Sequence, residues 1–179
     1  MFSQVIKFSN GVLISTTTNQ KKTFMNESVA SYTASIGVEY LEHKYFYLSS
    51  EIGYVQLGGK ESDAYIDAVH ASVCEKWNYL QLNTTFRVKY PINHTHFYLG
   101  LGPKLDMLLD SQRFKSSFLA DLPGLNRATV GAKTEVGVAY DFSKVRIGLN
   151  YSYSFNFMPV ARGLYNHNHA VMLSIGYRL

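Results

Sequence analysis

Cysteine and long apolar runs are what this 179-residue sequence most clearly lacks. Its single cysteine, Cys74, excludes an intrachain disulfide framework and a zinc cluster built from cysteine ligands. No apolar run approaches the ~18–20 residues that a membrane-spanning helix needs. Any contact with a bilayer must therefore be made by strands or at the membrane surface. The length suits one domain with a full core, so we expect residues 1–179 to form a single domain.

Charge is also scarce, because charged residues make up only 17% of the chain, against about a quarter in an average protein. The net charge is +4, but Lys and Arg are interspersed with Asp and Glu and form no basic run, so we expect no nucleic-acid partner. The first residues, MFSQVIKFSNGV, lack the basic start and apolar stretch of a signal peptide. Taken alone this indicates the cytoplasm; the alternative is a mature chain whose leader has been removed.

Strict alternation of apolar and polar residues is the main positive signal, and it is typical of strands with one apolar face. In 97–109 every second residue from Phe97 is apolar or proline, whereas the positions between carry Gly100, Gly102, Lys104 and Asp106. The pattern recurs in 32–40, 46–54, 80–90, 130–140, 145–157 and 171–179, which makes seven predicted strands. An eighth is expected around 4–17, where the turn dipeptide Asn10-Gly11 leaves open one strand or a short hairpin.

The connections between these segments alternate in length. Short turns are expected at 42–44, 91–95 and 142–144, and long polar loops at 18–30, 60–76, 110–127 and 158–168. In an antiparallel meander this places all long loops at one end. The sequence therefore predicts an all-β fold, an eight-stranded antiparallel up-and-down barrel whose closure leaves no strand edge.

Two barrels fit the alternation: a soluble lipocalin-like carrier with the apolar side chains inside, and a transmembrane barrel with them outside against lipid. The polar positions are rich in Gly, Ser, Thr and Asn, as a narrow interior requires. Their charges nearly balance, which favours a lumen, because an unpaired charge there is costly. The predicted lumen network comprises Glu39, Glu51, Arg87, Lys89, Lys104, Asp106, Lys133, Glu135, Arg146 and Arg178.

Aromatic residues of the apolar face gather toward the strand ends, like the two aromatic girdles of membrane barrels. Trp77 is expected in the girdle on the long-loop side. We therefore favour the transmembrane barrel over the soluble one. The predicted interface aromatics are Tyr40, Phe46, Tyr54, Tyr90, Phe97, Tyr140, Tyr151, Tyr153, Phe155 and Phe157.

Four segments resemble the PorT-like outer-membrane β-barrel family of Bacteroidota: YLQLNTTFRVKYPI, FYLGLGPKLDMLL, EVGVAYDFSKVRIGLNYSYSF and the closing VMLSIGYRL. The Gly-Leu-Gly-Pro step and the terminal Gly-Tyr-Arg-hydrophobic step are the closest matches, and the resemblance covers most of the chain after about residue 30. It implies a protein of the bacterial outer membrane, a mature chain without its signal peptide, which the barrel-assembly machinery inserts. On this basis we expect a monomer with lipid and lipopolysaccharide as partners. Many members carry the label porin, some relatives serve protein secretion, and no catalytic residue is carried over. The chain ends in Leu179, where assembly-signal strands often end in Phe.

Two histidine pairs, His94-x-His96 and His167-x-His169, have the spacing of metal ligands on one strand face. They belong to opposite ends of the predicted barrel, so we interpret them as polar turn and loop residues. An outer-membrane lipid A enzyme would need a His beside a Ser and a carboxylate. The His-x-Ser step is absent, and nothing positions Ser111, Ser116 or Ser117 of the third long loop. We expect no enzyme, no cofactor and no metal.

The function follows from the width of the barrel, because eight strands leave an interior only wide enough for side chains. We expect the lumen charges to plug the barrel, and the chain to be a structural, binding or adhesion-type surface protein. The soluble carrier and, less favoured, the lipid A enzyme are the alternatives. Pro103 beside Gly102 is expected to form a bulge or kink, with a hinge or gate as its alternative. Apolar residues of the third long loop are expected to pack over the mouth: Phe114, Phe118, Leu119 and Leu122.

Overall fold

The computed structural model of the chain describes residues 4–19, 27–66, 69–110, 124–161 and 163–179. In those ranges no helix is long and apolar enough to cross a membrane. The described elements are the strands β1 (Val5–Asn19), β2 (Ser28–Tyr40), β3 (Phe46–Ile66), β4 (Val69–Ile92), β5 (Thr95–Leu108), β6 (Ala128–Phe142), β7 (Val145–Asn156) and β8 (Leu164–Arg178).

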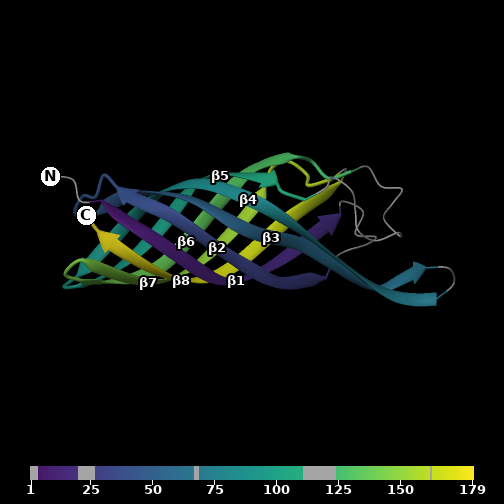
Figure 1. Cartoon of the computed structure of the whole chain (residues 1–179), viewed down its shortest axis with the longest axis horizontal. Coiled ribbons are helices and arrows are strands. Elements are labelled where there is room, and N and C mark those ends of the chain that lie inside the picture. Colours follow the sequence, from purple (N-terminus) through teal and green to yellow (C-terminus); the bar gives the residue numbers. More distant parts are fainter. Residues whose placement is uncertain (1–3, 20–26, 67–68, 111–123, 162) are drawn as a thin grey trace.

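The eight strands form one closed ring in sequence order. Every neighbouring pair is antiparallel, and β1 closes the ring on β8 by a register that runs from Val5 opposite Arg178 to Asn19 opposite Leu164. Both chain ends lie at the end of the barrel that carries the short turns (Figure 1). The predicted fold class, an eight-stranded antiparallel up-and-down barrel, is confirmed.

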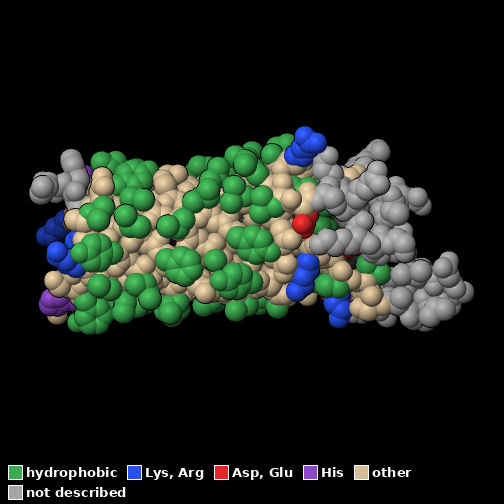
Figure 2. Space-filling view, viewed as in Figure 1, with side chains coloured by type: hydrophobic (Ala, Val, Ile, Leu, Met, Phe, Trp, Pro, Cys, Tyr) green, Lys and Arg blue, Asp and Glu red, His purple; other side chains and the backbone are tan. Residues whose placement is uncertain are grey.

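The apolar face of each strand points outward. Ile36, Phe86 and Leu99 are about half exposed, whereas the polar residues that alternate with them are buried. Figure 2 shows this as hydrophobic side chains spread over the wall between the two ends of the barrel. A carrier would bury these side chains around its ligand, so the lipocalin-like alternative is wrong.

The N-terminal segment is one strand and not a hairpin. Asn10 and Gly11 lie in the middle of β1, and their register with β2 and β8 continues on both sides. The glycine serves a close approach of strands rather than a turn: a Cβ on Gly11 would lie 2.0 Å from the carbonyl oxygen of Val171. The Asn10-Gly11 dipeptide suggests a turn, but its glycine is explained by the close approach of β1 and β8.

The prediction of a long loop at 60–76 is wrong. The strands β3 and β4 occupy its described residues and pair up to Ile66 and Val69, as a ribbon that projects beyond the ring (Figure 1). The sequence of this segment does not alternate clearly, and for that reason it predicts a loop. The bounds of two other predicted connections change less. The strand β8 begins at Leu164, within the loop expected at 158–168, and the turn expected at 91–95 comprises only Asn93 and His94.

Trp77 points into the barrel and not to a membrane interface, because β4 continues its alternation without a break below residue 80. The odd positions that bring Gln81 and Arg87 inside also bring Trp77 and Tyr79 inside, and both aromatic side chains are fully buried. The lumen near the long loops therefore contains a buried apolar cluster, beside buried polar side chains such as those of Ser15 and Asn166. Its buried cluster comprises Leu13, Val55, Leu57, Val73, Trp77, Tyr79, Leu125, Val160, Ala161, Leu164, Ala170 and Met172.

Pro103 interrupts the pairing of β4 with β5 without changing its register. Asn83 pairs with Lys104 and Phe86 with Leu101, and the two pairs between them are missing. A bulge would shift the register, so the predicted bulge is absent. Pro103 has no N–H to donate to β4, and its ring is exposed on the outer wall.

Candidate functional site

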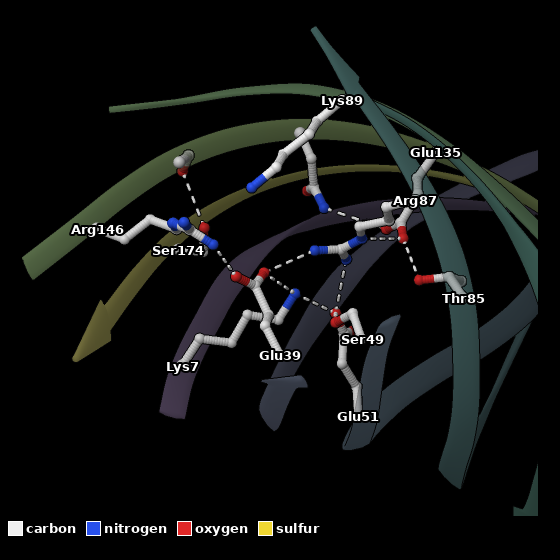
Figure 3. A network of polar contacts seen from close by, with 12 residues as sticks. Lys7, Glu39, Ser49, Glu51, Thr85, Arg87, Lys89, Glu135, Arg146 and Ser174 are labelled. Carbon is white, nitrogen blue, oxygen red and sulfur yellow. Dashed lines mark hydrogen bonds and ion pairs between the residues drawn. The ribbon is translucent and has the colours of Figure 1, made fainter. Parts of the chain in front are cut away.

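The guanidinium of Arg87 lies in the centre of the lumen and is fully buried. It donates one hydrogen bond to each of three carboxylates that come from β2, β3 and β6 (Figure 3). The N–O distances are 2.8 Å to Glu39, 3.0 Å to Glu51 and 2.7 Å to Glu135. The sequence-predicted residues of these four strands thus meet at one point.

Two lysines complete this central group. The Nζ of Lys7 lies 2.5 Å from Oε1 of Glu51, and the Nζ of Lys133 lies 3.2 Å from Oε2 of the same residue. Three cations therefore share three carboxylates, and all six side chains are at most 5% exposed. Buried charges of this kind are tolerated only when they are paired and hydrogen-bonded.

Aromatic rings fill the space beside the central group. The Arg87 guanidinium lies 4.8 Å from the ring centre of Tyr98 and 5.6 Å from that of Tyr47. Both tyrosines are inward-facing and buried, and their rings meet edge to face. Cation–π contacts of this type gain strength when they are withdrawn from water.

A second charged group lies at the short-turn end. Arg146 contacts Glu39 of the central group and also Glu42 and Asp141, at 2.5, 2.7 and 2.7 Å. Two more predicted residues join it there, with Lys89 at 2.6 Å from Glu42 and Arg178 at 3.2 Å from Asp141. Arg178 is the most exposed of these cations, with a third of its side chain accessible.

Lys104 and Asp106 form a separate pair. Their charged atoms are 2.5 Å apart, both side chains are fully buried, and Gln81 donates a further hydrogen bond to Asp106 at 2.7 Å. Beside this level an internal space of about 20 Å³ is bordered by Ser35, Asn83 and others. A space of this size holds about one water molecule.

Lys7, Glu42 and Asp141 were not among the predicted residues. Lys7 stands between the outward Ile6 and Phe8, so the alternation could have identified it if it had been followed through residues 4–17. Asp141 continues the inward positions of β6 beyond Ala139, so the alternation could have identified it if it had been followed past residue 140. Glu42 follows the end of β2, where alternation gives no signal, and its position over the lumen depends on how the turn folds back.

The ten predicted interface aromatics all stand on the outward face. Phe46, Tyr90, Phe97 and Tyr140 lie toward the short turns. Tyr153, Phe155 and Phe157 lie toward the long loops, where the first two rings are tilted against each other and the last two meet edge to face. That these rings meet a membrane interface stays a prediction.

The histidines lie mostly in strands and not in turns or loops. His94 is in a turn and stacks on Tyr140, whereas His96 is buried in the lumen. In the described part of the chain no group of three His, Cys, Asp or Glu could hold a metal ion. Of the two histidine pairs, His96 lies 3.6 Å from Asp141, His167 lies 3.0 Å from the hydroxyl of Tyr153, and His169 lies 2.6 Å from that of Tyr151.

Comparison with solved structures identifies the architecture. Neisserial surface protein A superposes with a TM-score of 0.61 at 10% identity, over 97% of this chain and 97% of its own. Ail, the attachment invasion locus protein of Yersinia pestis, in complex with the heparin analogue sucrose octasulfate, gives 0.54 at 15% identity over 98% and 99%. A structure of Ail without that ligand in its description gives 0.52 at 13% identity, over 98% of each chain.

The chain has the fold of an eight-stranded transmembrane β-barrel. No protein-family model matches the sequence, and no curated protein aligns with it. At identities of 10–15% the similarity to these proteins shows a common fold and does not show a common function. The residues named for a lipid A enzyme, Ser111, Ser116 and Ser117, lie outside the described residues, as do Phe114, Phe118, Leu119 and Leu122.

Glu42 makes the short-turn end of the barrel sensitive to acid. Burial alone would raise its pKa, but Arg146 and Lys89 hold the pKa below its ordinary value of 4.5. Because the folded state has the lower pKa, the Glu42 carboxylate adds stability that is complete above the unfolded value and is lost as the pH falls through the folded one.

We therefore expect Glu42→Gln to flatten the decline of the unfolding free energy below pH 4.5. Urea unfolding of the vesicle-bound barrel at a series of pH values measures this. Glu27→Gln, which alters a half-exposed carboxylate 3.6 Å from Lys60, is the matched control and should leave the decline unchanged. Equal slopes for Glu42→Gln and the unmodified chain would contradict the expectation.

Proposed function

We propose that this chain is a surface protein of the bacterial outer membrane, with a lumen closed to ions and with its contacts made at the long-loop end. The observation that carries the proposal is the order of side chains along the lumen. The paired charges around Arg87 occupy the half near the short turns, and the apolar cluster around Trp77 occupies the half near the long loops. An ion would have to pass both in series.

A role in binding or adhesion, rather than catalysis, is supported by the exterior of the barrel. The ribbon formed by β3 and β4 projects beyond the ring (Figure 1). Proteins of similar fold are described as a surface protein and as an attachment invasion locus protein. PorT-like membership rests on the sequence resemblance. In this proposal the outer wall contacts lipid and lipopolysaccharide, the barrel-assembly machinery inserts the chain, and the barrel works as a monomer.

Two measurements test the proposal. The purified chain should require detergent, and its band should migrate faster on gels when it is not heated, because the folded barrel resists the detergent. In planar bilayers with molar KCl it should give no conductance steps. Trp77→Ala should also give none, because the charged group around Arg87 remains in series with the emptied level.

The two arms fail separately. A chain that is fully soluble without detergent and shows no heat-dependent band would contradict the membrane location. A chain that inserts and conducts in discrete steps would contradict the closed lumen alone.

A further inference from the structure

The outer wall of the barrel carries a groove of about 830 Å³. Ile36 of β2 borders it on one side and Leu105 of β5 on the other, and Ser50 and Thr84 lie between them. In the middle of the face drawn in Figure 2 the hydrophobic cover gives way to an area of polar side chains and backbone. The groove is shallow and open along the wall, so an occupant would be covered on one side only.

The groove exists because small residues replace large ones along one row of the wall. Ser50 and Thr84 are paired neighbours on β3 and β4, and each is followed or preceded by a bulky residue at the next outward position, Ile52 and Leu82. Pro103 borders the groove where the pairing of β4 with β5 is interrupted. The missing pairs between β4 and β5 thus lie beside the groove.

A chain of hydroxyl groups leads into this groove from the short-turn end. The hydroxyl of Tyr40, the last residue of β2, lies 3.0 Å from Oγ of Ser50, which lies 2.9 Å from Oγ1 of Thr84. The three hydroxyl groups have three hydrogens, but the two hydrogen bonds between them use only two. One hydrogen therefore has no acceptor among the described residues. An unmet donor facing hydrocarbon is costly, and the hydroxyl chain is therefore complementary to an acceptor oxygen.

We infer that the groove binds one acyl chain of an ester-linked membrane lipid, whose ester carbonyl accepts the free hydrogen of the Tyr40–Ser50–Thr84 chain. The groove is continuous with the apolar outer wall, so hydrocarbon is what surrounds it in a bilayer. A thin, flexible acyl chain fits a groove, whereas the convex wall of a second barrel would bridge it and leave it unfilled. This inference rests on the proposed membrane location.

Photo-cross-linking tests it. The barrel is inserted into vesicles of dioleoylphosphatidylcholine that contain a trace of phosphatidylcholine with a diazirine on one acyl chain, and the cross-linked peptides are mapped by mass spectrometry. We expect peptides that contain Ser50, Thr84 and Pro103 to be labelled about fivefold more than the outer wall of β7 and β8, a preference that one net hydrogen bond supports.

The double variant Ser50→Leu, Thr84→Leu fills the groove and removes two of the three hydroxyls, and it should abolish the enrichment while the heat-dependent gel shift persists. Thr16→Leu is the matched control. It removes another outward hydroxyl, 2.8 Å from Oγ of Ser28 and outside the groove, and it should keep the enrichment.

Even labelling around the wall of the inserted barrel would overturn the inference and leave the proposed function standing. Protein–protein cross-links through the groove, with lipid excluded, would overturn it in favour of a second copy. Failure of the chain to enter vesicles would overturn the proposed function and the inference together.

Discussion

Arg87→Leu is expected to lower the free energy of unfolding by about 3–5 kcal/mol, the usual cost of removing one partner from a buried ion pair. The substitution removes a cation that contacts Glu39, Glu51 and Glu135 at once. Lys7 and Lys133 remain beside these carboxylates, and Arg146 remains beside Glu39. Leucine fills part of the space but cannot donate a hydrogen bond. Urea unfolding in lipid vesicles, followed by the fluorescence of the single tryptophan, Trp77, measures the change.

Two further variants show whether the loss belongs to the network. Lys60→Met removes one partner of a half-exposed pair 3.6 Å long at the other end of the barrel and should cost less than about 1 kcal/mol. Arg87→Lys keeps the charge but loses the fork that reaches three carboxylates, so its effect should be intermediate. If Arg87→Leu unfolded no more readily than Lys60→Met, the central group would have no structural role.

Gly131→Ala is expected to destabilise the barrel by about 3 kcal/mol, near the upper end of what overpacking usually costs. A Cβ on Gly131 would lie 2.0 Å from the carbonyl oxygen of Phe155 and 3.0 Å from the Cα of Asn156. Both are backbone atoms of β7, so β6 and β7 must separate to admit the methyl group. The same unfolding assay measures the loss, and weaker protection of the β6–β7 amides from hydrogen exchange should accompany it.

Gly148→Ala is the matched control for this prediction. A Cβ there would meet Oγ of Ser174 at 2.7 Å and its next neighbours only at 3.5 Å. A serine side chain rotates away at little cost, and the loss of glycine's freedom in the unfolded chain favours alanine. We expect a change of less than about 1 kcal/mol. Equal effects of the two substitutions would show that the backbone contact at Gly131 does not limit stability.

The strands that were predictable are those whose two faces meet different surroundings. In β5 and β7 the apolar side chains meet the exterior and the polar ones the lumen over the whole length, so period two is visible in the sequence. The sequence of the β3–β4 ribbon beyond the ring shows no clear period of two, so it predicts a loop where the structure has paired strands. Trp77 was misplaced for a related reason: aromatic character suggested an interface, while the alternation of β4 placed it inside.

For the lumen charges, alternation predicts which face a side chain occupies but not its level along the barrel. Level depends on the stagger of the strands, which no single strand encodes. Lys104 and Asp106 therefore have the predicted face but pair with each other instead of joining the group around Arg87. Glu42 could not be predicted for a different reason. It lies in a turn, where alternation gives no information, and the conformation of the turn brings it to Arg146 in the lumen network.

The closure of β1 on β8 has a consequence for how the chain folds. Each of the other pairings joins strands that are adjacent in the sequence, so it can form as a local hairpin, but this last one joins Val5 to Arg178. The ring-closing step therefore has the largest loop-closure entropy of any single pairing and is expected to be slow and late. Until it occurs, β1 and β8 each expose an unpaired row of N–H and C=O groups, which other chains can join. Aggregation during refolding should accordingly begin at these two strands.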